Sequence, residues 1–590
     1  MGLIRRNAVP AYNNRTHTTP YPRTHIPTHP HTHILLLTSA GLSYNQWLGD
    51  RNYLNEPNDN LIITPPFSEW ENDRFHCRWK GIVFIRGTLA GAPSLEKFSR
   101  QAESEGIETA AAALSGMFFL AVLDKRRQRR YCLVDNTGLF QAFYSPSRVS
   151  TSFLRLARVE GLRADDLSPR SVVEFIHLGN VFFNRTFFDR VRKIDGDQIL
   201  ALEPAKEVQI REKRLPPLWG LPPKENLTEM MEATAQSLAE RTIGIDLTGG
   251  FDSRLLALLC LQAGLRFETG VSGSNSHPDV TGSSSIAQRL GIKHTVADYS
   301  SDNLEPKLLE AFSASDALAD PVPVMRTTEL QLKRKAGGID LALSAGGGEI
   351  FDDFFWLQDF PFYRSRRAHL QRLFKFRFRP LSPPHDLFDD RYRGISDGLV
   401  RAFTADLERF RRSTNTQTYD NIFIRCRWKE NLGRSLTGFT RYIDYYAPYL
   451  EYDAMRIALA LPLRDRIDTR AQKQLLESLD AEIAGMPLLT RNYMTLMKYS
   501  FLLGPARGFF LQTGQMLATA SASKVRRFLI ESAKTPGFEG KIQSLPSLSG
   551  YTEALHQTGI LNQAVNLSSV KLPFLGRFIS LGLLLDHLGR

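Results

Sequence analysis

The 590-residue sequence predicts an α+β protein: a layered β-rich front domain, then an α/β domain with a parallel sheet, ending in a helical region. Three observations predict this fold. Short apolar runs bounded by turn residues recur over 59–210, as in a layered sheet. From 226 to about 360, strand-like and helix-like segments alternate, which is typical of a parallel sheet. Beyond about 360 the pattern is mostly helical and rich in Arg and Phe.

Composition limits the class of protein. Hydrophobic residues make up 42% of the chain and charged residues 23%, which is typical of a soluble globular protein. No apolar run approaches the roughly 20 residues of a membrane-spanning helix, so we expect no membrane association and a cytoplasmic location. The net charge of +12 indicates weak attraction to anionic ligands. The cysteines are scattered without a CxxC pair, which argues against a disulfide framework or zinc ribbon.

Residues 1–58 are expected to form a low-complexity, disordered extension. Residues 1–33 are rich in Thr, Pro, His and Arg and cannot form a hydrophobic core. The histidines of this segment could bind a metal ion, but a low-complexity tail or a wrongly assigned start codon explains them better. These histidines are His17, His25, His29, His31 and His33. No apolar segment typical of a signal peptide follows them.

The rest of the chain divides at a Pro-rich stretch. Residues 59–213 form the front domain, in which "IVFIRGTLAG", "MFFLAVLD", "RRYCLVD" and "QAFYS" are expected strands. The stretch "RLPPLWGLPPKE" at 214–225 is expected to be a linker. Residues 226–590 form the second domain, with strands expected at 243–247 and 267–272 and helices beginning near 253 and 281.

The stretch "IDLTGGFDSR" at 245–254 places two glycines, an acid and a hydroxyl where a strand becomes a helix. Ligands of open parallel sheets bind beyond the strand ends, where helix N-termini attract anions. Gly249 and Gly250 would let the backbone approach a phosphate closely, and Asp252 could hold a Mg²⁺ that accompanies it. A tight turn with a helix cap is the plain alternative. The spacing fits neither GxxxxGK[ST] nor GxGxxG, but the full string favours phosphate binding.

"LTGGFDSR" resembles the SGGxDS pyrophosphate (PP) loop of the N-type ATP pyrophosphatases, in the branch of asparagine synthetase and β-lactam synthetase. Later segments resemble this family in the same order. They are "PDVTGSSSIAQRLGIKH" (278–294), "LALSAGGGEIFDDFF" (341–355) and "YYAPYLEYDAMRIALALPLRDRI" (445–467). The resemblance implies an adenine nucleotide α-hydrolase-like fold for this domain.

The resemblance also implies a reaction. A substrate carboxylate attacks ATP, pyrophosphate leaves, and an amine captures the acyl-adenylate to give an amide and AMP. Asp252 and Glu349 would hold Mg²⁺, and Lys498 is a weak candidate for the family's catalytic lysine, with a solvated surface lysine as the alternative. The residues implied in nucleotide binding are Leu247, Thr248, Gly249, Gly250, Asp252, Ser253, Gly346 and Gly347. The substrates would be a small carboxylate and an amine. The sequence specifies neither their identities nor the oligomeric state of the protein.

The front half resembles a class II glutaminase-type domain, which implies an Ntn-like fold. The resemblance lies in "ALSGMFFLAVLDKRRQRRYCLVDNTGLFQAFYS" (113–145) and "NRTFFDRVRKIDGDQILAL" (184–202). Such enzymes need an N-terminal cysteine, whereas this chain begins Met-Gly and its first cysteine is Cys77. The family's N-G-E motif aligns with Arg86, Gly87 and Thr88. We therefore expect no glutaminase activity and a role in packing and scaffolding, as in the similar domain of β-lactam synthetases.

The segment "SAGGGEIF" departs from the family's S-G-x-G-G-D-E pattern. Either Gly348 replaces the second acid, or the loop is one residue shorter and Glu349 stands in for it. Glu349 could also cap a helix over 349–357 from its first turn; both alternatives stay open. The position of the family's general base offers only Ala345 or Gly346.

The basic run "RSRRAHLQRLFKFRFRP" at 364–380 could bind a nucleic acid. An amphipathic helix with a solvated Arg face is the favoured alternative.

Three candidate functions follow from the sequence. An asparagine synthetase-like, ATP-dependent amide-forming ligase leads, a catalytically degenerate nucleotide-binding scaffold is second, and a nucleic-acid-modifying PP-loop enzyme is third.

Overall fold

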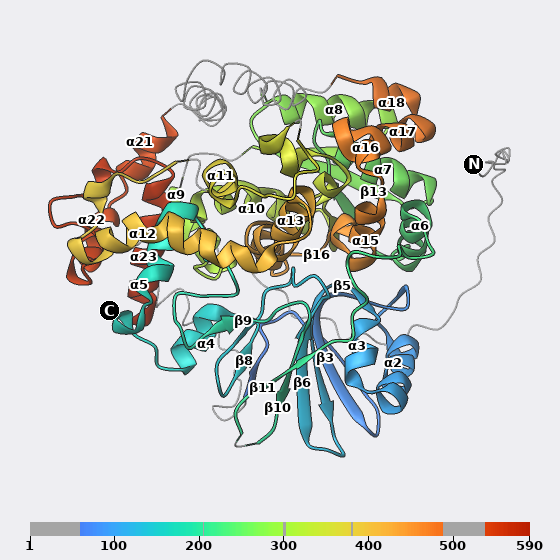
Figure 1. Cartoon of the computed structure of the whole chain (residues 1–590), viewed down its shortest axis with the longest axis horizontal. Helices are drawn as coiled ribbons and strands as arrows, with labels where there is room; N and C mark the ends of the chain where they lie inside the picture. The colour runs from blue at the N-terminus through green and yellow to red at the C-terminus, as the bar shows by residue number, and fades with distance from the viewer. Residues whose placement is uncertain are drawn as a thin grey trace.

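The computed structural model of the chain describes residues 60–204, 206–275, 277–298, 303–360, 362–378, 381–487 and 537–589. The front domain lies below an α/β domain and its helices (Figure 1). The N-terminal extension, Lys498 and "MPLLTR" beyond Pro487 lie outside the described residues, so the expectations about them stay predictions. In the part of the chain that is described, every helix is too short or too polar to traverse a bilayer.

The front domain contains a seven-stranded antiparallel sheet and a small second sheet, as the layered pattern predicts. The large sheet has the order β11-β10-β6-β5-β3-β2, with β4 paired to β3. Its strands are β2 Ser68–Glu71, β3 Phe75–Ile85, β4 Thr88–Leu89, β5 Leu114–Asp124, β6 Arg129–Val134, β10 Gln198–Leu202 and β11 Gln209–Glu212. The small sheet has the order β1-β8-β7-β9. Its strands are β1 Leu61–Ile62, β7 Phe143–Tyr144, β8 Val149–Ser150 and β9 Arg192–Lys193.

Both faces of the large sheet are buried, because alternate residues of a strand point to opposite sides. On β5, Phe118 and Leu120 face a core closed by helices α2 (Ala92–Glu105) and α3 (Ile107–Ala112). Phe119 and Ala121, on the opposite face, join the main core of the molecule. That core also contains the small sheet and helices α4 (Phe153–Val159) and α5 (Pro169–Leu178).

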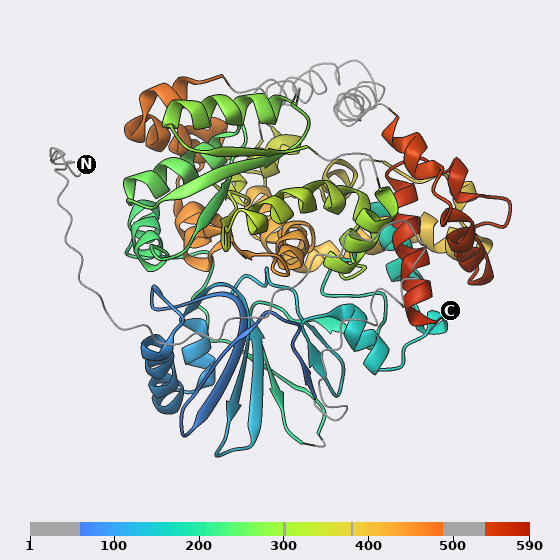
Figure 2. The ribbon, with the colours of Figure 1, turned by 180° about the vertical axis from the view of Figure 1, so that it is seen from behind.

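The second domain is built on a five-stranded parallel sheet with the order β14-β13-β12-β15-β16 (Figure 2). The strands are β12 Ile243–Asp246, β13 Phe267–Ser272, β14 His294–Ala297, β15 Leu341–Leu343 and β16 Asp444–Tyr446. The helices between them are α6 Leu227–Ser237, before β12, then α7 Phe251–Gln262, α8 Pro278–Leu290, α9 Leu304–Ala314 and α10 Pro321–Ala336. No helix or strand lies between Glu212 and Leu227, where the linker is expected.

The region after 360 is mostly helical, as expected, but it also returns to the sheet to add β16, which the pattern did not predict. Two short helices, η2 Gly348–Phe351 and η3 Phe354–Asp359, precede this region. Its own first elements are α11 Leu370–Leu373, η4 Phe374–Phe378, η5 His385–Leu387, α12 Asp390–Leu407, η6 Glu408–Phe410 and α13 Asn415–Ile422. The following ones are η7 Phe423–Arg427, η8 Lys429–Gly433, α14 Arg434–Phe439, η9 Pro448–Leu450, α15 Tyr452–Ala460, α16 Leu463–Arg466, η10 Ile467–Thr469, α17 Arg470–Leu479 and α18 Ala481–Gly485.

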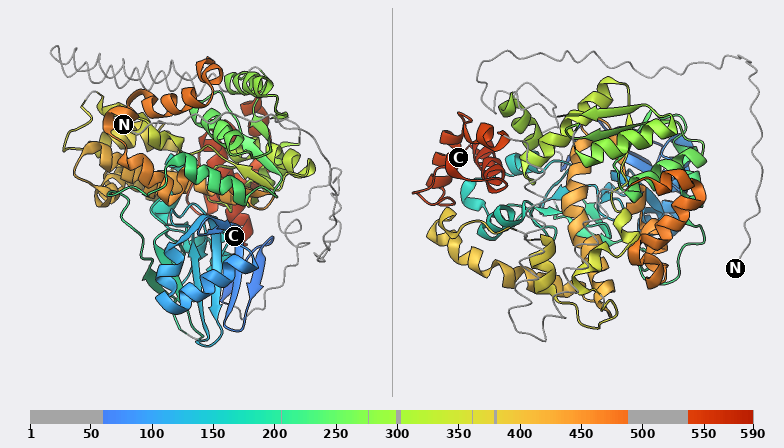
Figure 3. Two further views of the ribbon diagram at one scale, coloured as in Figure 1. Left: turned by 90° about the vertical axis from the view of Figure 1, so that its right-hand side faces the viewer. Right: turned by 90° about the horizontal axis from the view of Figure 1, so that it is seen from above.

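The C-terminal elements are α21 Phe538–Gln543, α22 Leu548–Gln557, η11 Leu567–Ser569 and α23 Phe574–Leu588. Helix α23 contacts α5 and α10, so the end of the chain closes back onto both halves of the molecule. Figures 1 and 3 place these helices at the opposite end of the molecule from α17 and α18.

Candidate active site

The centre of the parallel sheet places two glycine-rich loops side by side. The chain runs from β12 outward to β13 and β14, then returns to β15 and β16 on the other side. The order therefore reverses between the neighbouring strands β12 and β15, and ligands of such sheets bind in the crevice at this point. The loops 247–250 and 344–348 both begin there, at the carboxyl ends of these strands.

The loop after β12 is held by its own hydroxyls. The Ser253 hydroxyl accepts a hydrogen bond from the Thr248 N–H at 3.0 Å and lies 3.1 Å from the Thr248 hydroxyl. The Thr248 hydroxyl in turn accepts from the Gly250 N–H at 3.2 Å. Helix α7 begins directly after Gly250, so the free N–H groups of its first turn face the crevice. The predicted role of both hydroxyls toward phosphate stays a prediction, and here they shape the loop.

Helix α8 approaches the first loop closely at Gly282. A Cβ on Gly282 would lie 3.1 Å from the Gly249 Cα, which is tighter than ordinary contacts, whereas a Cβ on Gly249 would lie 3.8 Å from the Gly282 Cα. Leu247 is fully buried and its N–H donates to the Gly270 carbonyl at 3.0 Å, so only its backbone borders the crevice. The pair of glycines thus lets a helix and a loop meet at backbone distance.

The loop after β15 rests on two leucines from distant parts of the chain. A Cβ on Gly346 would lie 2.4 Å from Cδ2 of Leu432, and one on Gly347 would lie 2.3 Å from Cδ2 of Leu450. Gly347 also has a φ of +93°, which side chains rarely tolerate. A side chain at either position would therefore require the leucine beneath it to move.

Gly348 brings the two loops together. A Cβ at this position would lie 2.4 Å from Cγ of Asp252. Gln472 of α17 joins the same two residues, since its amide donates to Asp252 Oδ1 at 2.7 Å and to the Gly348 carbonyl at 3.1 Å. With Asp252 in this position, an aspartate at 348 would have no space.

Three acids gather at this junction. Burial and the charge of Glu349 raise the pKa of Asp252 to about 7, although the Gln472 hydrogen bond opposes this. Burial also raises the pKa of Glu349. Burial, and then the charge of Asp252, raise the pKa of Asp352 well above its usual range. The sequence analysis missed Asp352, although its position three residues after Glu349 is a usable signal.

The contacts of Glu349 are compatible with both of its expected roles, as a metal ligand and as a helix cap. Its carboxylate accepts the Gly347 N–H at 3.1 Å, which is a cap-like contact, while its charge also acts on Asp252. The single helix expected over 349–357 is wrong: η2 ends at Phe351, Asp352 is extended with φ −128°, and η3 follows. Both roles of Glu349 therefore stay open.

The residues at the junction fit a Mg²⁺ held jointly with a polyphosphate. Within the described ranges no group of three or more His, Cys, Asp or Glu is arranged to hold a metal by itself. Mg²⁺, however, is usually bound through one or two carboxylates together with substrate phosphates and water. Asp252 and Glu349 supply that number, and their mutual repulsion would be relieved by a cation. The buried Oε1 of Gln472 has no hydrogen-bond partner among the described residues, so a polar ligand or water is also accommodated.

Arg254 holds the first loop against a later segment of the chain. Its buried guanidinium donates to the carbonyls of Gly249, Ile483, Met486 and Pro487 at 2.8–3.1 Å. Burial lowers its pKa. The arginine therefore ties the loop to the segment after α18. Local sequence pattern carries no signal for this role, nor for that of Gln472, because Ile483 and Asp252, with which they interact, lie more than 200 residues away.

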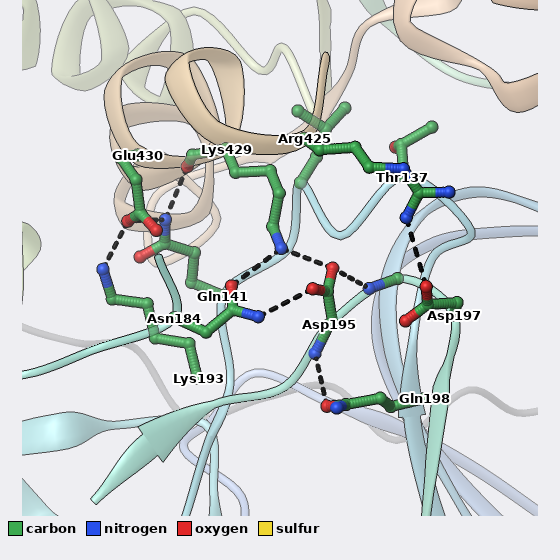
Figure 4. A network of polar contacts seen from close by, with 12 residues as sticks. Thr137, Gln141, Asn184, Lys193, Asp195, Asp197, Gln198, Arg425, Lys429 and Glu430 are labelled. Atoms are coloured by element: carbon green, nitrogen blue, oxygen red, sulfur yellow. Dashed lines mark hydrogen bonds and ion pairs between the residues drawn. The ribbon is translucent and has the colours of Figure 1, made fainter. Parts of the chain in front are cut away.

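The front domain fixes Leu432 and Leu450, the two leucines on which the second loop rests. Two residues before Leu432, Glu430 pairs with Lys193 in a fully buried contact, and the preceding Lys429 pairs with Asp195 (Figure 4). The Gln141 amide donates to the Lys429 carbonyl at 2.5 Å. Burial would raise the pKa of Asp195, but the Lys429 ammonium and further hydrogen bonds hold it below its usual range.

The second support is anchored in the same way. Glu451, next to Leu450, accepts a hydrogen bond from the Gly116 N–H of β5 at 2.5 Å. Gly433, next to Leu432, approaches the front domain so closely that a Cβ would lie 2.5 Å from the Leu139 carbonyl oxygen. Each glycine of the pair 346–347 thus rests on a leucine whose sequence neighbour is fixed by the front domain.

The second domain is similar to a known protein family. Residues 227–492 match the family model described as asparagine synthase. This part of the chain is called the asparagine synthase domain below. A comparison with curated proteins finds no match. The asparagine synthase domain supports assignment to a family of ATP-dependent, amide-forming ligases, and the crevice between β12 and β15 lies inside it.

Cys77, the first cysteine of the chain, is not accessible in the front domain. Cys77 on β3 is fully buried, and burial raises the pKa of its thiol to about 12. Arg86 and Gly87, both with positive φ, form the two-residue turn between β3 and β4. This turn also meets the asparagine synthase domain, since the Ser237 hydroxyl donates to the Gly87 carbonyl. The expected absence of glutaminase activity stays a prediction.

Proposed function

We propose that this protein is an ATP-dependent ligase that joins a carboxylate to an amine through an acyl-adenylate, with release of AMP and pyrophosphate. The observation that carries the proposal is the junction of the two glycine-rich loops inside the asparagine synthase domain. Asp252 and Glu349 meet there beside free N–H groups of α7. This combination of acids and backbone donors suits a metal-bound polyphosphate.

In this proposal the backbone of residues 247–250 and of Gly346 and Gly347 borders the nucleotide phosphates. Asp252 and Glu349 would hold Mg²⁺, which neutralises charge on the phosphates when bound. The α7 N-terminus orients the leaving pyrophosphate through its dipole and N–H groups. Gln472 positions the Asp252 carboxylate, and Arg254 keeps the loop closed against its helix.

The front domain supplies no ammonia from glutamine in this proposal. Its task is to fix Leu432 and Leu450 under the second loop through Glu430, Lys429 and Glu451. The amine would therefore come from a substrate other than glutamine, bound directly at the ligase site.

The proposal is tested by ATP–pyrophosphate exchange over a panel of amino acids and small carboxylic acids. Exchange that depends on one acid, and that Asp252→Ala abolishes, supports it. The control is Asp453→Ala, which removes an exposed acid of α15 and leaves the crevice intact. Exchange that survives Asp252→Ala would place the reaction elsewhere.

A nucleotide-binding scaffold is the second candidate. Two observations favour it: residues 345 and 346 are Ala and Gly, which cannot act as a base, and Glu349 already accepts a backbone hydrogen bond. Mg·ATP binding in calorimetry, without exchange for any acid, would select the scaffold. A nucleic-acid-modifying enzyme is disfavoured, because Phe374 and Phe378 of the basic run are buried and unavailable for stacking on bases.

A further inference from the structure

The basic run has a buried face and a cationic face. Phe374 and Phe378 pack against Phe403 of α12 at ring distances of 4.9 and 5.1 Å. Leu370 and Leu373 are buried with them. Of the amphipathic helix expected over the run, the structure has Leu370–Leu373 as α11 and Phe374–Phe378 as the π-helix η4, and Arg377 within it is buried. Such π-helical segments are frequent at functional sites.

The cationic face lines a pocket of about 730 Å³ between this segment and the end of α12. That volume lies within the roughly 300–1,000 Å³ of small-molecule sites. Four cations line it, namely Arg367, Arg372, Lys375 and Arg411, and the exposed His369 lies among them. Glu408 is the one carboxylate among the lining residues.

Two of the cations are held in place. The Arg411 guanidinium pairs with Glu408 and donates to the Ala368 carbonyl at 3.1 Å. The Arg372 guanidinium donates to the Gln358 carbonyl at 3.0 Å and lies 3.5 Å from Asp359. Both side chains remain 41% exposed, so each guanidinium keeps donors for a ligand.

The other two cations are uncompensated. Arg367 and Lys375 are exposed and form no ion pair within the described part of the chain. The pocket therefore carries two positive charges beyond those that Glu408 and Asp359 balance. Fixed guanidinium groups together with free cations are the arrangement that binds carboxylate or phosphate groups in two-pronged contacts.

We propose that this pocket is a binding site for a compact anion with two or more oxyanion groups. The ligand is a small polyphosphate or a small polycarboxylate, since both present closely spaced oxygens to guanidinium groups. The pocket is lined by residues 367–376 and 404–411, none of which belongs to the glycine-rich loops. The proposal is therefore independent of the ligase reaction.

The test is isothermal titration calorimetry of the full chain with tripolyphosphate in one arm and citrate in the other, in metal-free buffer without a chelator at 50 mM salt. The wild type is expected to bind at least one of them, and binding should weaken several-fold at 300 mM salt because charges are screened. The arm that binds more tightly identifies the oxyanion.

Arg367→Gln/Lys375→Gln is expected to weaken this binding at least tenfold. The matched control is Arg366→Gln/Lys335→Gln, which removes the same charge from exposed residues outside the pocket and should change affinity less than twofold. Asp252→Ala should retain the binding, which separates this pocket from the loop site. The absence of wild-type binding below 1 mM for both anions, or equal losses in the pocket variant and control, would overturn the proposal.

Discussion

Replacing Gly348 with alanine places a methyl group 2.4 Å from Cγ of Asp252 and 2.6 Å from its Oδ1. Ordinary contacts at a Cβ are 3.4–4 Å long, so the Asp252 carboxylate must move by about 1 Å. That movement takes it away from the Gln472 amide, which now lies 2.7 Å from Oδ1. The substitution thus adds one methyl group and disturbs a proposed metal ligand.

The expected cost follows from these contacts. Overpacking of a tight site typically costs about 1–3 kcal/mol, and the lost hydrogen bond about 1 kcal/mol more. Melting should fall by several degrees, at about 2–4 °C per kcal/mol for a domain of ordinary size. Mg·ATP affinity should fall about 10- to 100-fold, as when the support of a metal ligand is removed.

The assays are differential scanning fluorimetry and calorimetry with Mg·ATP. Gly346→Ala is the matched control, because its methyl group meets only the terminal methyls and Cγ of Leu432, whose side chain can rotate. Its losses should be clearly smaller in both assays. If Gly348→Ala melts within 1 °C of the wild type and binds Mg·ATP within twofold, the contact with Gly348 does not position Asp252.

Three further substitutions test the acids and the front domain. Glu349→Gln should weaken Mg·ATP binding by far more than the 0.3–1 kcal/mol of a dipole contact and barely change melting; the reverse result would make Glu349 a cap. Burial, followed by the charges of Asp135 and Asp453, raises the pKa of Glu451 from 4.5 to about 8, although hydrogen bonds from Gly116 and Tyr446 oppose this. Its contribution to stability is therefore complete below pH 4.5 and is lost as pH rises toward 8. Melting curves from pH 5 to 9 should therefore show the wild type losing stability relative to Glu451→Gln, by at most about 5 kcal/mol, and a constant difference would contradict this. Glutamine should release no glutamate above buffer controls; release that Cys77→Ser abolishes would show a working glutaminase.

Local pattern was sufficient for the elements that form the first loop. The strand expected at 243–247 is observed over Ile243–Asp246 as β12, and α7 begins within two residues of its expected start. Apolar spacing and the two glycines carry this information, because both features act over a few residues. The same reasoning placed Asp252 and Ser253 at the start of the helix.

Features that depend on distant partners were missed. Strand β16 has three residues and becomes a strand only because β15 offers a free edge about 100 residues earlier in the chain. Gln472 gains its role from Asp252, and Leu432 gains its role from Gly346. The helix expected over 349–357 failed for a local reason, since extended Asp352 accepts the Phe354 N–H and divides it.

The anchoring of Leu432 and Leu450 affects how the chain folds during synthesis. Their ionisable neighbours Lys429, Glu430 and Glu451 leave the ribosome after the front domain, and N-terminal domains generally fold first. Each of these side chains therefore meets a finished partner surface and is never buried alone. A fragment that starts at residue 226 loses those partners, and breaking one buried ion pair costs about 3–5 kcal/mol. Such a fragment should aggregate when expressed alone and become soluble when residues 1–225 are produced in the same cell.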